Sequence, residues 1–303
     1  MGRTSFSDAI GPRKETTVNT KDSAKVKLGQ SPESERARPS TAEREWDADA
    51  YHRISEPQFG WGMKVLRRLE LQGDERVLDV GCGSGRLTAE LRERLPRGVV
   101  VATDLSLNMV AAARATLGVR FRNRCHVVNA AAQALPFYRA FDVVFSTATF
   151  HWVMDLPELF HSIFAALVPG GRLHAQCGGG WNLVALHARA DTLRESSEFA
   201  RFFGAWRAPW QFADDIATAT RLRAAGFSNV GTSLEHAPTV FPDSVTYSEF
   251  LAKVVVRPYL IHLPDDALRT RFVSALAEQA AADTQPFSLD YWRLNLAATR
   301  PGE

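Results

Sequence analysis

The sequence has few of the features that build disulfide frameworks, zinc sites or membrane spans. Only three cysteines occur in 303 residues, and Cys82, Cys125 and Cys177 are too scattered for a disulfide framework or a zinc site. No apolar run approaches the roughly 18 to 20 residues that span a bilayer. No apolar signal core is present near the N-terminus. These absences favour a cytoplasmic protein that does not enter a membrane.

A large excess of charge of either sign is also missing. The chain has 36 lysine and arginine residues against 34 aspartate and glutamate residues, which gives a net charge of +2. A nucleic-acid-binding domain usually carries a strongly basic face. We therefore expect no nucleic acid among the partners.

Residues 1–45 lack the apolar side chains that a folded core requires, and Phe6 is their only aromatic residue. Such a segment cannot bury enough apolar surface to offset the entropy lost on ordering. We expect a disordered polar tail over 1–45 and one folded domain over 46–303, with order beginning near Trp46.

Strand and helix patterns alternate through most of the folded part. The spacing predicts strands at 76–80, 99–103, 121–128, 141–146, 172–176, 228–236 and 287–296, and helices at 86–95, 106–116, 156–167 and 213–225. We expect Ser106 to cap the second of these helices. The pattern predicts an α/β fold, a Rossmann-like doubly wound and mostly parallel sheet with helices on both faces. Helical insertions are expected at about 181–225 and 245–283.

A glycine-rich turn follows the first predicted strand, where residues 77–85 read Val-Leu-Asp-Val-Gly-Cys-Gly-Ser-Gly. Glycines permit positive φ and close approach of the backbone to a ligand. The dinucleotide fingerprint G-x-G-x-x-G would place its last glycine where this chain has Arg86. Asp104 ends the second strand, where an acid can accept the hydroxyls of a ribose. The turn therefore favours a nucleotide site without a bound pyrophosphate; a plain strand-to-helix connection is the alternative.

This segment resembles motif I of the class I S-adenosylmethionine-dependent methyltransferases, and the likeness extends from about residue 51 to residue 301. Within that family the chain is most similar to the trans-aconitate and malonyl-carrier-protein methyltransferase group. The resemblance is carried by Tyr51, Ser55, Pro57 and Gln58, by residues 77–85, by Asp104, Ser106 and Met109, by residues 134–137, by Phe141 and Asp142, and by residues 151–153. It implies a seven-stranded sheet whose last strand is antiparallel and inserted beside the fifth.

The resemblance also implies a cofactor, S-adenosyl-L-methionine, and a set of residues around it. By this likeness Asp79 lies near the amino group of the methionine part and Asp104 accepts the ribose hydroxyls. The remaining cofactor residues would be Gly81, Gly83 and Gly85 beside the methionine part, Leu105 and Met109 on either side of the adenine, and the backbone N–H of Ala132 at a ring nitrogen. A plain helix-core role is the alternative for Met109.

Two positions depart from the family pattern. Ala131 stands where relatives usually carry an acid that accepts from the adenine amino group, and Thr147 stands where they often carry asparagine. A missing hydrogen bond of this kind is worth about 0.5–1.5 kcal/mol, so we expect weaker cofactor binding and not its loss.

The acceptor site is expected beyond the carboxyl ends of the strands. His151 falls there and is the candidate general base; a structural imidazole bonded to a carbonyl is the alternative. Tyr51 and Gln58 belong to a segment that would fold over the cofactor, with simple helix packing as the other possibility. Trp181 would roof the acceptor pocket or belong to a helical core. Arg257 would anchor a carboxylate or phosphate, or lie on the surface.

These observations lead to one main hypothesis and three alternatives. The main hypothesis is a methyltransferase that acts on a small molecule, such as a carboxylic acid or a specialised metabolite. The departures at Ala131 and Thr147 keep open a protein that binds S-adenosylmethionine but has weak or lost methyl transfer. Arg86 argues against an NAD(P)-dependent oxidoreductase. A nucleic-acid methyltransferase is disfavoured because residues 146–149 lack an Asn/Asp-Pro-Pro-aromatic motif. The histidines show no metal-ligand spacing, and the oligomeric state is left open.

Overall fold

A computed structural model of the chain describes residues 45–46, 56–118, 120–121 and 123–303. The expected tail lies outside these residues except for Glu45, and Tyr51 lies outside them as well. The first helix of the described part is α3 (Glu56–Arg68).

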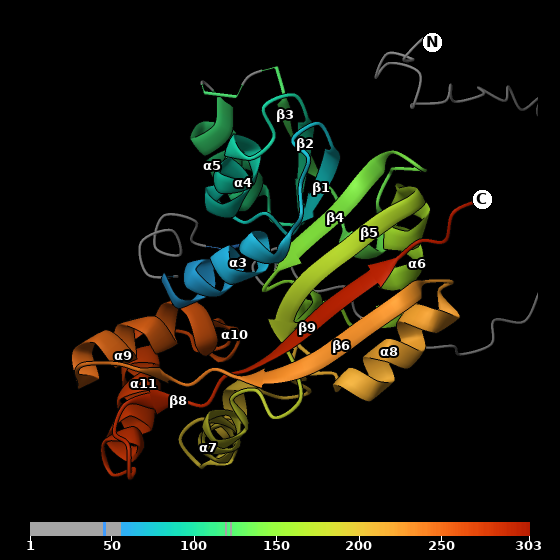
Figure 1. Ribbon diagram of the computed structural model, residues 1–303. Coiled ribbons are helices and arrows are strands. Elements are labelled where there is room, and N and C mark those ends of the chain that lie inside the picture. Colours follow the sequence, from blue (N-terminus) through green and yellow to red (C-terminus); the bar gives the residue numbers. More distant parts are fainter. Residues whose placement is uncertain (1–44, 47–55, 119, 122) are drawn as a thin grey trace, which may run out of the picture.

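A seven-stranded sheet forms the centre of the molecule, with strand order β3-β2-β1-β4-β5-β9-β6 (Figure 1). Its strands are β1 (Arg76–Val80), β2 (Val99–Asp104), β3 (Cys125–Asn129), β4 (Phe141–Thr147), β5 (Leu167–Gly178), β6 (Ser228–His236) and β9 (Trp292–Thr299). Neighbours from β3 to β5 pair in parallel. Strand β9 runs antiparallel to both β5 and β6. The predicted fold class and the inserted antiparallel strand are confirmed.

Alternating side chains of the central strands are buried on both faces of the sheet. Val77 and Val143 pack with α3 and α4 (Arg86–Glu93) on one face. Leu78 and Val144 pack with α6 (Leu156–Ala166) and α8 (Asp215–Ala224) on the other. Because both faces are covered, these strands are continuous apolar runs, as is typical of parallel sheets.

Aspartate side chains begin four of the helices. Asp155, Asp214, Asp243 and Asp265 each accept a hydrogen bond from the backbone N–H three residues later, at 2.7 to 3.1 Å. Each satisfies an N–H group that has no partner within its own helix. The predicted cap at Ser106 is confirmed too, since its Oγ accepts from Met109 N at 3.2 Å in α5 (Leu107–Gly118).

Three predicted boundaries were wrong. The strand expected at 287–296 is two strands, β8 (Ser288–Leu289), which pairs with β7 (Thr239–Val240), and β9. Left-handed backbone at Phe287 (φ 54°) and a turn in which Tyr291 N donates to Leu289 O interrupt the expected strand. The fifth strand was expected at 172–176, after the Pro-Gly-Gly of residues 169–171. Strand β5 begins instead at Leu167, directly after α6, and includes these three residues. Strand β3 begins at residue 125 because the residues before it form a turn.

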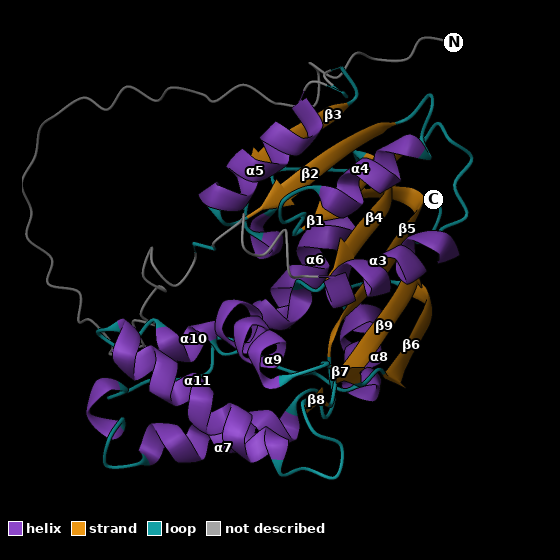
Figure 2. Cartoon of the chain, turned by 90° about the vertical axis from the view of Figure 1, so that its left-hand side faces the viewer, coloured by secondary structure: helices purple, strands orange, loops and turns teal. Residues whose placement is uncertain are grey.

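The two expected insertions form a helical cap. It contains α7 (Val184–Glu195), α9 (Ser244–Phe250), a π-helical stretch (Leu251–Val255), α10 (Arg257–Leu260) and α11 (Asp266–Ala281). These helices lie together beyond the end of the sheet to which β4 and β5 point (Figures 1 and 2). Tyr247, Tyr259 and Phe272 are the largest fully buried side chains of their shared core. The cap thus closes over the end of the sheet where α/β proteins bind ligands.

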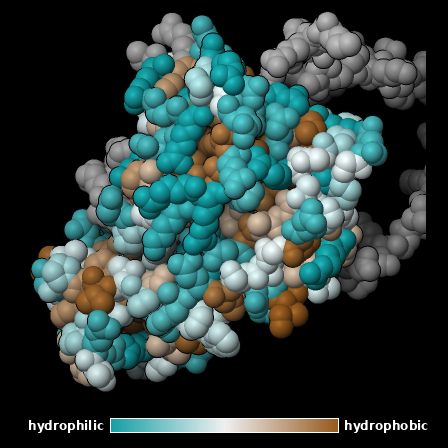
Figure 3. Space-filling model, viewed as in Figure 1, coloured by the Kyte–Doolittle hydropathy of each residue, from teal (hydrophilic) through white to brown (hydrophobic). Residues whose placement is uncertain are grey.

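Hydrophilic residues cover most of the face seen in Figure 3, and apolar residues appear there as separate spots. No helix among the described residues is both long and apolar enough to cross a bilayer.

Candidate active site

The glycine turn between β1 and α4 requires glycine at two positions for different reasons. At Gly81 (φ 76°) a Cβ would lie 2.0 Å from Thr149 Oγ1, so no larger residue fits against the loop that follows β4. At Gly83 (φ 54°) a Cβ would meet nothing within 4 Å. There the backbone conformation favours glycine, and the turn borders open space.

Asp104 is held against this turn by backbone N–H groups. Its Oδ2 accepts from Gly83 N and its Oδ1 accepts from Ser106 N, both at 2.9 Å. Burial raises the pKa of Asp104 above its ordinary value, although these hydrogen bonds act in the opposite direction. The carboxylate is therefore oriented before any ligand binds.

Asp79 provides a second, more deeply buried acid beneath the turn. Its side chain is buried, and Thr88 Oγ1 donates to Asp79 Oδ2 at 2.6 Å. The pKa of Asp79 is raised to about 7, mainly by burial and in smaller part by the negative charge of Asp104, against the effect of the Thr88 hydrogen bond. The site therefore favours a cationic ligand group, which would stabilise the ionised form of Asp79.

Sequence reasoning missed a third acid at this site. The Glu45 carboxylate accepts from Leu107 N at 3.1 Å, Asn108 N at 3.0 Å and Ser106 Oγ at 2.9 Å, and so caps α5. Burial alone would raise the pKa of Glu45, but these hydrogen bonds lower it overall. The sequence offers no signal for this contact, because the two partners lie about sixty residues apart.

The predicted adenine-side residues differ in exposure. Leu105 is 48 % exposed and offers open apolar surface beside Asp104, whereas Met109 is 4 % exposed and lies inside α5. Burial of Met109 agrees with the helix-core alternative. Ala131 precedes the short 3₁₀ turn Ala132–Ala134, and Thr147 ends β4.

A cavity opens beside the loop that follows β4. About 530 Å³ of space, part of it open to solvent, lies among side chains from the sheet, from α3 and from the cap. It is lined by Trp46, Gln58, Ala148, His151, Trp152, Asn182, Leu183, His187, Trp210, Phe212, Val254, Val255, Tyr291 and Arg293. Two predicted acceptor-site residues, Gln58 and His151, therefore come together here. The buried Oε1 of Gln58 has no hydrogen-bond partner among the described residues.

The geometry of His151 does not suit a general base. Its Nδ1 accepts from Gly178 N at 3.3 Å, so the lone pair on that nitrogen is already used. The pKa of His151 is lowered to about 3, mainly by burial and in smaller part by the charges of Arg293 and His187. The alternative prediction was an imidazole bonded to a carbonyl group. The observed partner of the His151 ring is instead the backbone N–H of Gly178. We correct the prediction accordingly: the imidazole is neutral and carries its proton on Nε2.

Trp181 and Arg257 do not line this cavity. Trp181 is 60 % exposed and packs edge-on against Trp292, with the ring centroids 5.1 Å apart. The Arg257 guanidinium donates to the backbone oxygen of Glu45 and lies 5.1 Å from the Trp46 ring centroid. Arg257 therefore contacts Glu45, which caps α5, and Trp46, which lines the cavity.

Two basic cavity residues were absent from the sequence prediction, namely His187 on α7 and Arg293 on β9. The Arg293 side chain is buried, and its guanidinium lies 4.5 Å from the Trp61 ring centroid. An arginine that alternates with buried leucines in a predicted strand was the available signal for Arg293. A helical histidine such as His187 carries no comparable signal.

Comparisons with known proteins find sequence similarity to methyltransferases. The sequence profile of the methyltransferase domain family matches residues 77–171. Trans-aconitate 2-methyltransferase of Variovorax paradoxus is 29% identical over 237 residues, which cover 73% of this chain and 84% of that protein. The enzyme of the same name from Deinococcus radiodurans is 25% identical over 272 residues, covering 84% of this chain and 98% of that protein. These matches support a class I S-adenosylmethionine-dependent methyltransferase.

Solved structures show the same fold at low sequence identity. The YcgJ protein of Bacillus subtilis has a TM-score of 0.57 and 13% identity, covering 81% of this chain and 100% of that one. Phosphoethanolamine N-methyltransferase 2 of Haemonchus contortus, in complex with S-adenosylhomocysteine, has a TM-score of 0.56 and 18% identity, covering 84% of this chain and 57% of that one.

The site of this methyltransferase fits S-adenosylmethionine. Open space borders Gly83, the Asp104 carboxylate is oriented at the same turn, and Asp79 lies beneath it. When bound, the cofactor supplies the methyl group of its sulfonium ion, and the rest of the cofactor leaves as a neutral thioether. The contact of Gly81 with Thr149 joins this turn to the loop that carries His151. The cofactor turn and the cavity are therefore neighbours.

Proposed function

We propose that this protein transfers the methyl group of S-adenosylmethionine to a carboxylate oxygen of a small molecule. The supporting observation is the buried Arg293 guanidinium in the wall of the cavity. Arg293 and His151 line the same cavity. A cation in a desolvated wall favours an anionic ligand group.

A carboxylate acceptor also suits the chemistry of the cavity. A carboxylate is ionised near pH 7 and attacks a sulfonium methyl group without a base, and His151 is not arranged to act as one. The protein then has to align the two groups and exclude water. The aromatic lining, which includes Trp152, Trp210 and Phe212, serves both needs. The names of the relatives, trans-aconitate 2-methyltransferases, point to the same class of acceptor.

In this proposal the residues divide into two groups. Asp79, Gly81, Gly83, Gly85, Asp104, Leu105, Met109, Ala131, Ala132 and Thr147 bind the cofactor, with Asp104 on the ribose and Asp79 near the amino group. Gln58, His151 and Arg293 contact the acceptor.

Substitution of Arg293 by methionine tests the acceptor class. The change keeps the length of the side chain and removes its charge, so we expect KM for trans-aconitate to rise at least tenfold while S-adenosylmethionine still binds. The charge-assisted contact that is lost is worth about 1.5–3 kcal/mol. Arg223→Met, at an exposed arginine of α8, is the matched control and should leave KM unchanged.

Two results would contradict the proposal. Equal KM values for Arg293→Met and the unsubstituted protein would remove Arg293 from the acceptor site. Cofactor binding without transfer to any carboxylic acid tested would favour the alternative, a protein that binds S-adenosylmethionine but has lost transfer, as the departures at Ala131 and Thr147 suggest.

A further inference from the structure

Two imidazoles, those of His151 and His187, line the acceptor cavity. Both residues are half-buried and have aromatic neighbours: Trp210 is stacked on His187 at 4.5 Å, and Phe212 lies near both rings at 5.7 to 5.8 Å. Burial lowers the pKa of His187 to about 4, as it lowers that of His151 to about 3. Both rings are therefore neutral near pH 7, and each carries its single proton on one of two nitrogens.

The partner of Nδ1 decides which nitrogen carries the proton. For His151 that partner is a donor, the N–H of Gly178 at 3.3 Å, so Nδ1 accepts and Nε2 is protonated. Gly178 does not line the cavity, and Nδ1 therefore faces away from it. The edge of the ring left for the cavity is Nε2–H, a hydrogen-bond donor.

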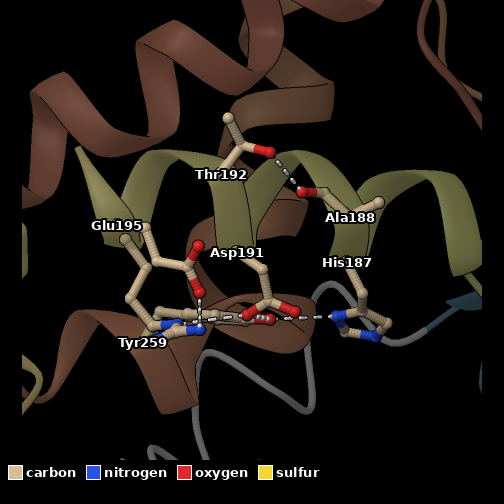
Figure 4. Close-up of polar contacts among 7 residues, drawn as sticks. His187, Ala188, Asp191, Thr192, Glu195 and Tyr259 are labelled. Atoms are coloured by element: carbon tan, nitrogen blue, oxygen red, sulfur yellow. Dashed lines mark hydrogen bonds and ion pairs between the residues drawn. The ribbon is translucent and has the colours of Figure 1, made fainter.

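For His187 the partner has the opposite character. Tyr259 Oη lies 3.5 Å from His187 Nδ1 and 3.3 Å from Asp191 Oδ1 (Figure 4). The ionised Asp191 carboxylate can only accept, so the Tyr259 hydroxyl donates its proton to Asp191. The tyrosine then presents a lone pair to Nδ1, and this contact is favourable when Nδ1 carries the proton.

The surroundings of His187 hold this arrangement in place. Arg194 Nε lies 3.2 Å from Asp191 Oδ1 and stabilises the ionised carboxylate. Tyr259 is fully buried and stacked on Phe272 at 5.8 Å, so its hydroxyl cannot turn to solvent. Among the described residues, His151, Tyr291 and Arg293 are the other titratable or charged groups that line the cavity with His187. Tyr259 does not line the cavity. The second ring nitrogen of His187 points away from Tyr259 (Figure 4).

We propose that the cavity holds its two imidazoles in opposite tautomers, with His151 presenting an Nε2–H donor and His187 presenting an unprotonated Nε2 acceptor. His187, and not His151, is then the proton-accepting group of the cavity, and Tyr259 is its positioning residue. This arrangement favours a ligand that carries a hydroxyl or similar donor group beside its carboxylate over the same ligand without that group. The preference for such a ligand rests on the proposed function, whereas the assignment of the two tautomers does not.

Nitrogen NMR of the full chain labelled with ¹⁵N-histidine tests the assignment directly. Long-range proton–nitrogen correlations distinguish the Nδ1–H from the Nε2–H tautomer, and His151→Phe and His187→Phe identify the two sets of signals. We expect the Nε2–H pattern for His151 and the Nδ1–H pattern for His187. The same tautomer at both positions would overturn the proposal.

Tyr259→Phe separates positioning from packing, because it removes the hydroxyl and keeps the ring. We expect the His187 signals to shift toward the Nε2–H pattern and those of His151 to stay unchanged. Tyr247→Phe, at another buried tyrosine of the same core, is the matched control and should change neither. An unaltered His187 in Tyr259→Phe would show that the hydroxyl does not set the tautomer.

Binding of succinate and malate, in the presence of S-adenosylhomocysteine, tests the selection. These acids differ by one hydroxyl, and we expect malate to bind about 2- to 10-fold more tightly, with the preference lost in Tyr259→Phe. Equal affinities would refute the selection. If neither acid binds, the selection fails, whereas methyl transfer to a carboxylic acid decides the proposed function and the spectrum decides the tautomers.

Discussion

At the scale of single residues, the cofactor end of the site is dominated by acids with different surroundings. Asp104 is oriented by two backbone N–H groups, while Asp79 is buried with only the Thr88 hydroxyl bonded to it in the described part of the chain. A pKa of about 7 places Asp79 at the midpoint of its titration near neutral pH. Its charge is therefore available to respond to a cationic ligand.

Cofactor binding should release protons from Asp79. A cationic amino group stabilises the carboxylate and lowers its pKa, so at pH 7 we expect release of about half a proton per site. Calorimetry of S-adenosylmethionine binding in buffers of different ionisation enthalpy measures this number.

Two variants sharpen that measurement. Asp79→Asn should bind more weakly and abolish the release. Thr88→Val removes the hydrogen bond that lowers the pKa of Asp79, and should increase the release at pH 7. Release that is unchanged in Asp79→Asn would assign it to another group.

At the scale of secondary-structure elements, long-range contacts complete what local signals begin. The glycine turn and the Ser106 cap follow from residues close in the sequence, and these were predictable, whereas the place of the antiparallel strand was implied by the family resemblance. The break between β8 and β9 was not predictable, because it depends on a turn at residues 290–291, where Tyr291 N donates to Leu289 O. The Glu45 contact with α5 and the meeting of His187 with Tyr259 were equally unpredictable, because tertiary packing brings distant residues together.

The Glu45 cap on α5 can be tested by hydrogen exchange. Glu45→Ala removes the acceptor from Leu107 N and Asn108 N, and a cap of this kind is worth about 0.5–2 kcal/mol. We expect these two amides to exchange several-fold faster. Asp214→Ala, which removes the cap of α8, should speed exchange at Ala217 and leave α5 unchanged. Unaltered exchange at both α5 amides in Glu45→Ala would contradict the capping role.

At the scale of the whole molecule, the sheet supplies the cofactor turn and the cap supplies much of the acceptor cavity. The sheet was predictable because strand periodicity and parallel pairing are local or repetitive. The cavity was not, since its polar residues come from α3, α7, β9 and the loop after β4, and only folding brings them together. The two neutral imidazoles buried there also affect stability.

Stability should fall in acid partly because of these imidazoles. The pKa of His187 is about 4 in the folded chain and about 6.5 in the unfolded chain, so between these values the unfolded state binds more protons. Stability then decreases as the pH falls from 6.5 toward 4, by about 1.4 kcal/mol per pH unit for this group.

Urea unfolding measured across that range checks this contribution. We expect His187→Asn and His187→Phe both to reduce the slope of unfolding free energy against pH by about one proton relative to the unsubstituted chain. Agreement between two variants of different size separates the slope from any change in packing. A slope equal to that of the unsubstituted chain in either variant would contradict the buried, neutral state of His187.

The most direct test of the central claim is transfer of a labelled methyl group from S-adenosylmethionine to trans-aconitate. Our account predicts a labelled product that is a methyl ester, which releases its label as methanol in mild base, and far less of it with Arg293→Met. A protein that binds the cofactor yet transfers no label to a carboxylic acid, or a labelled product stable to base, would contradict it.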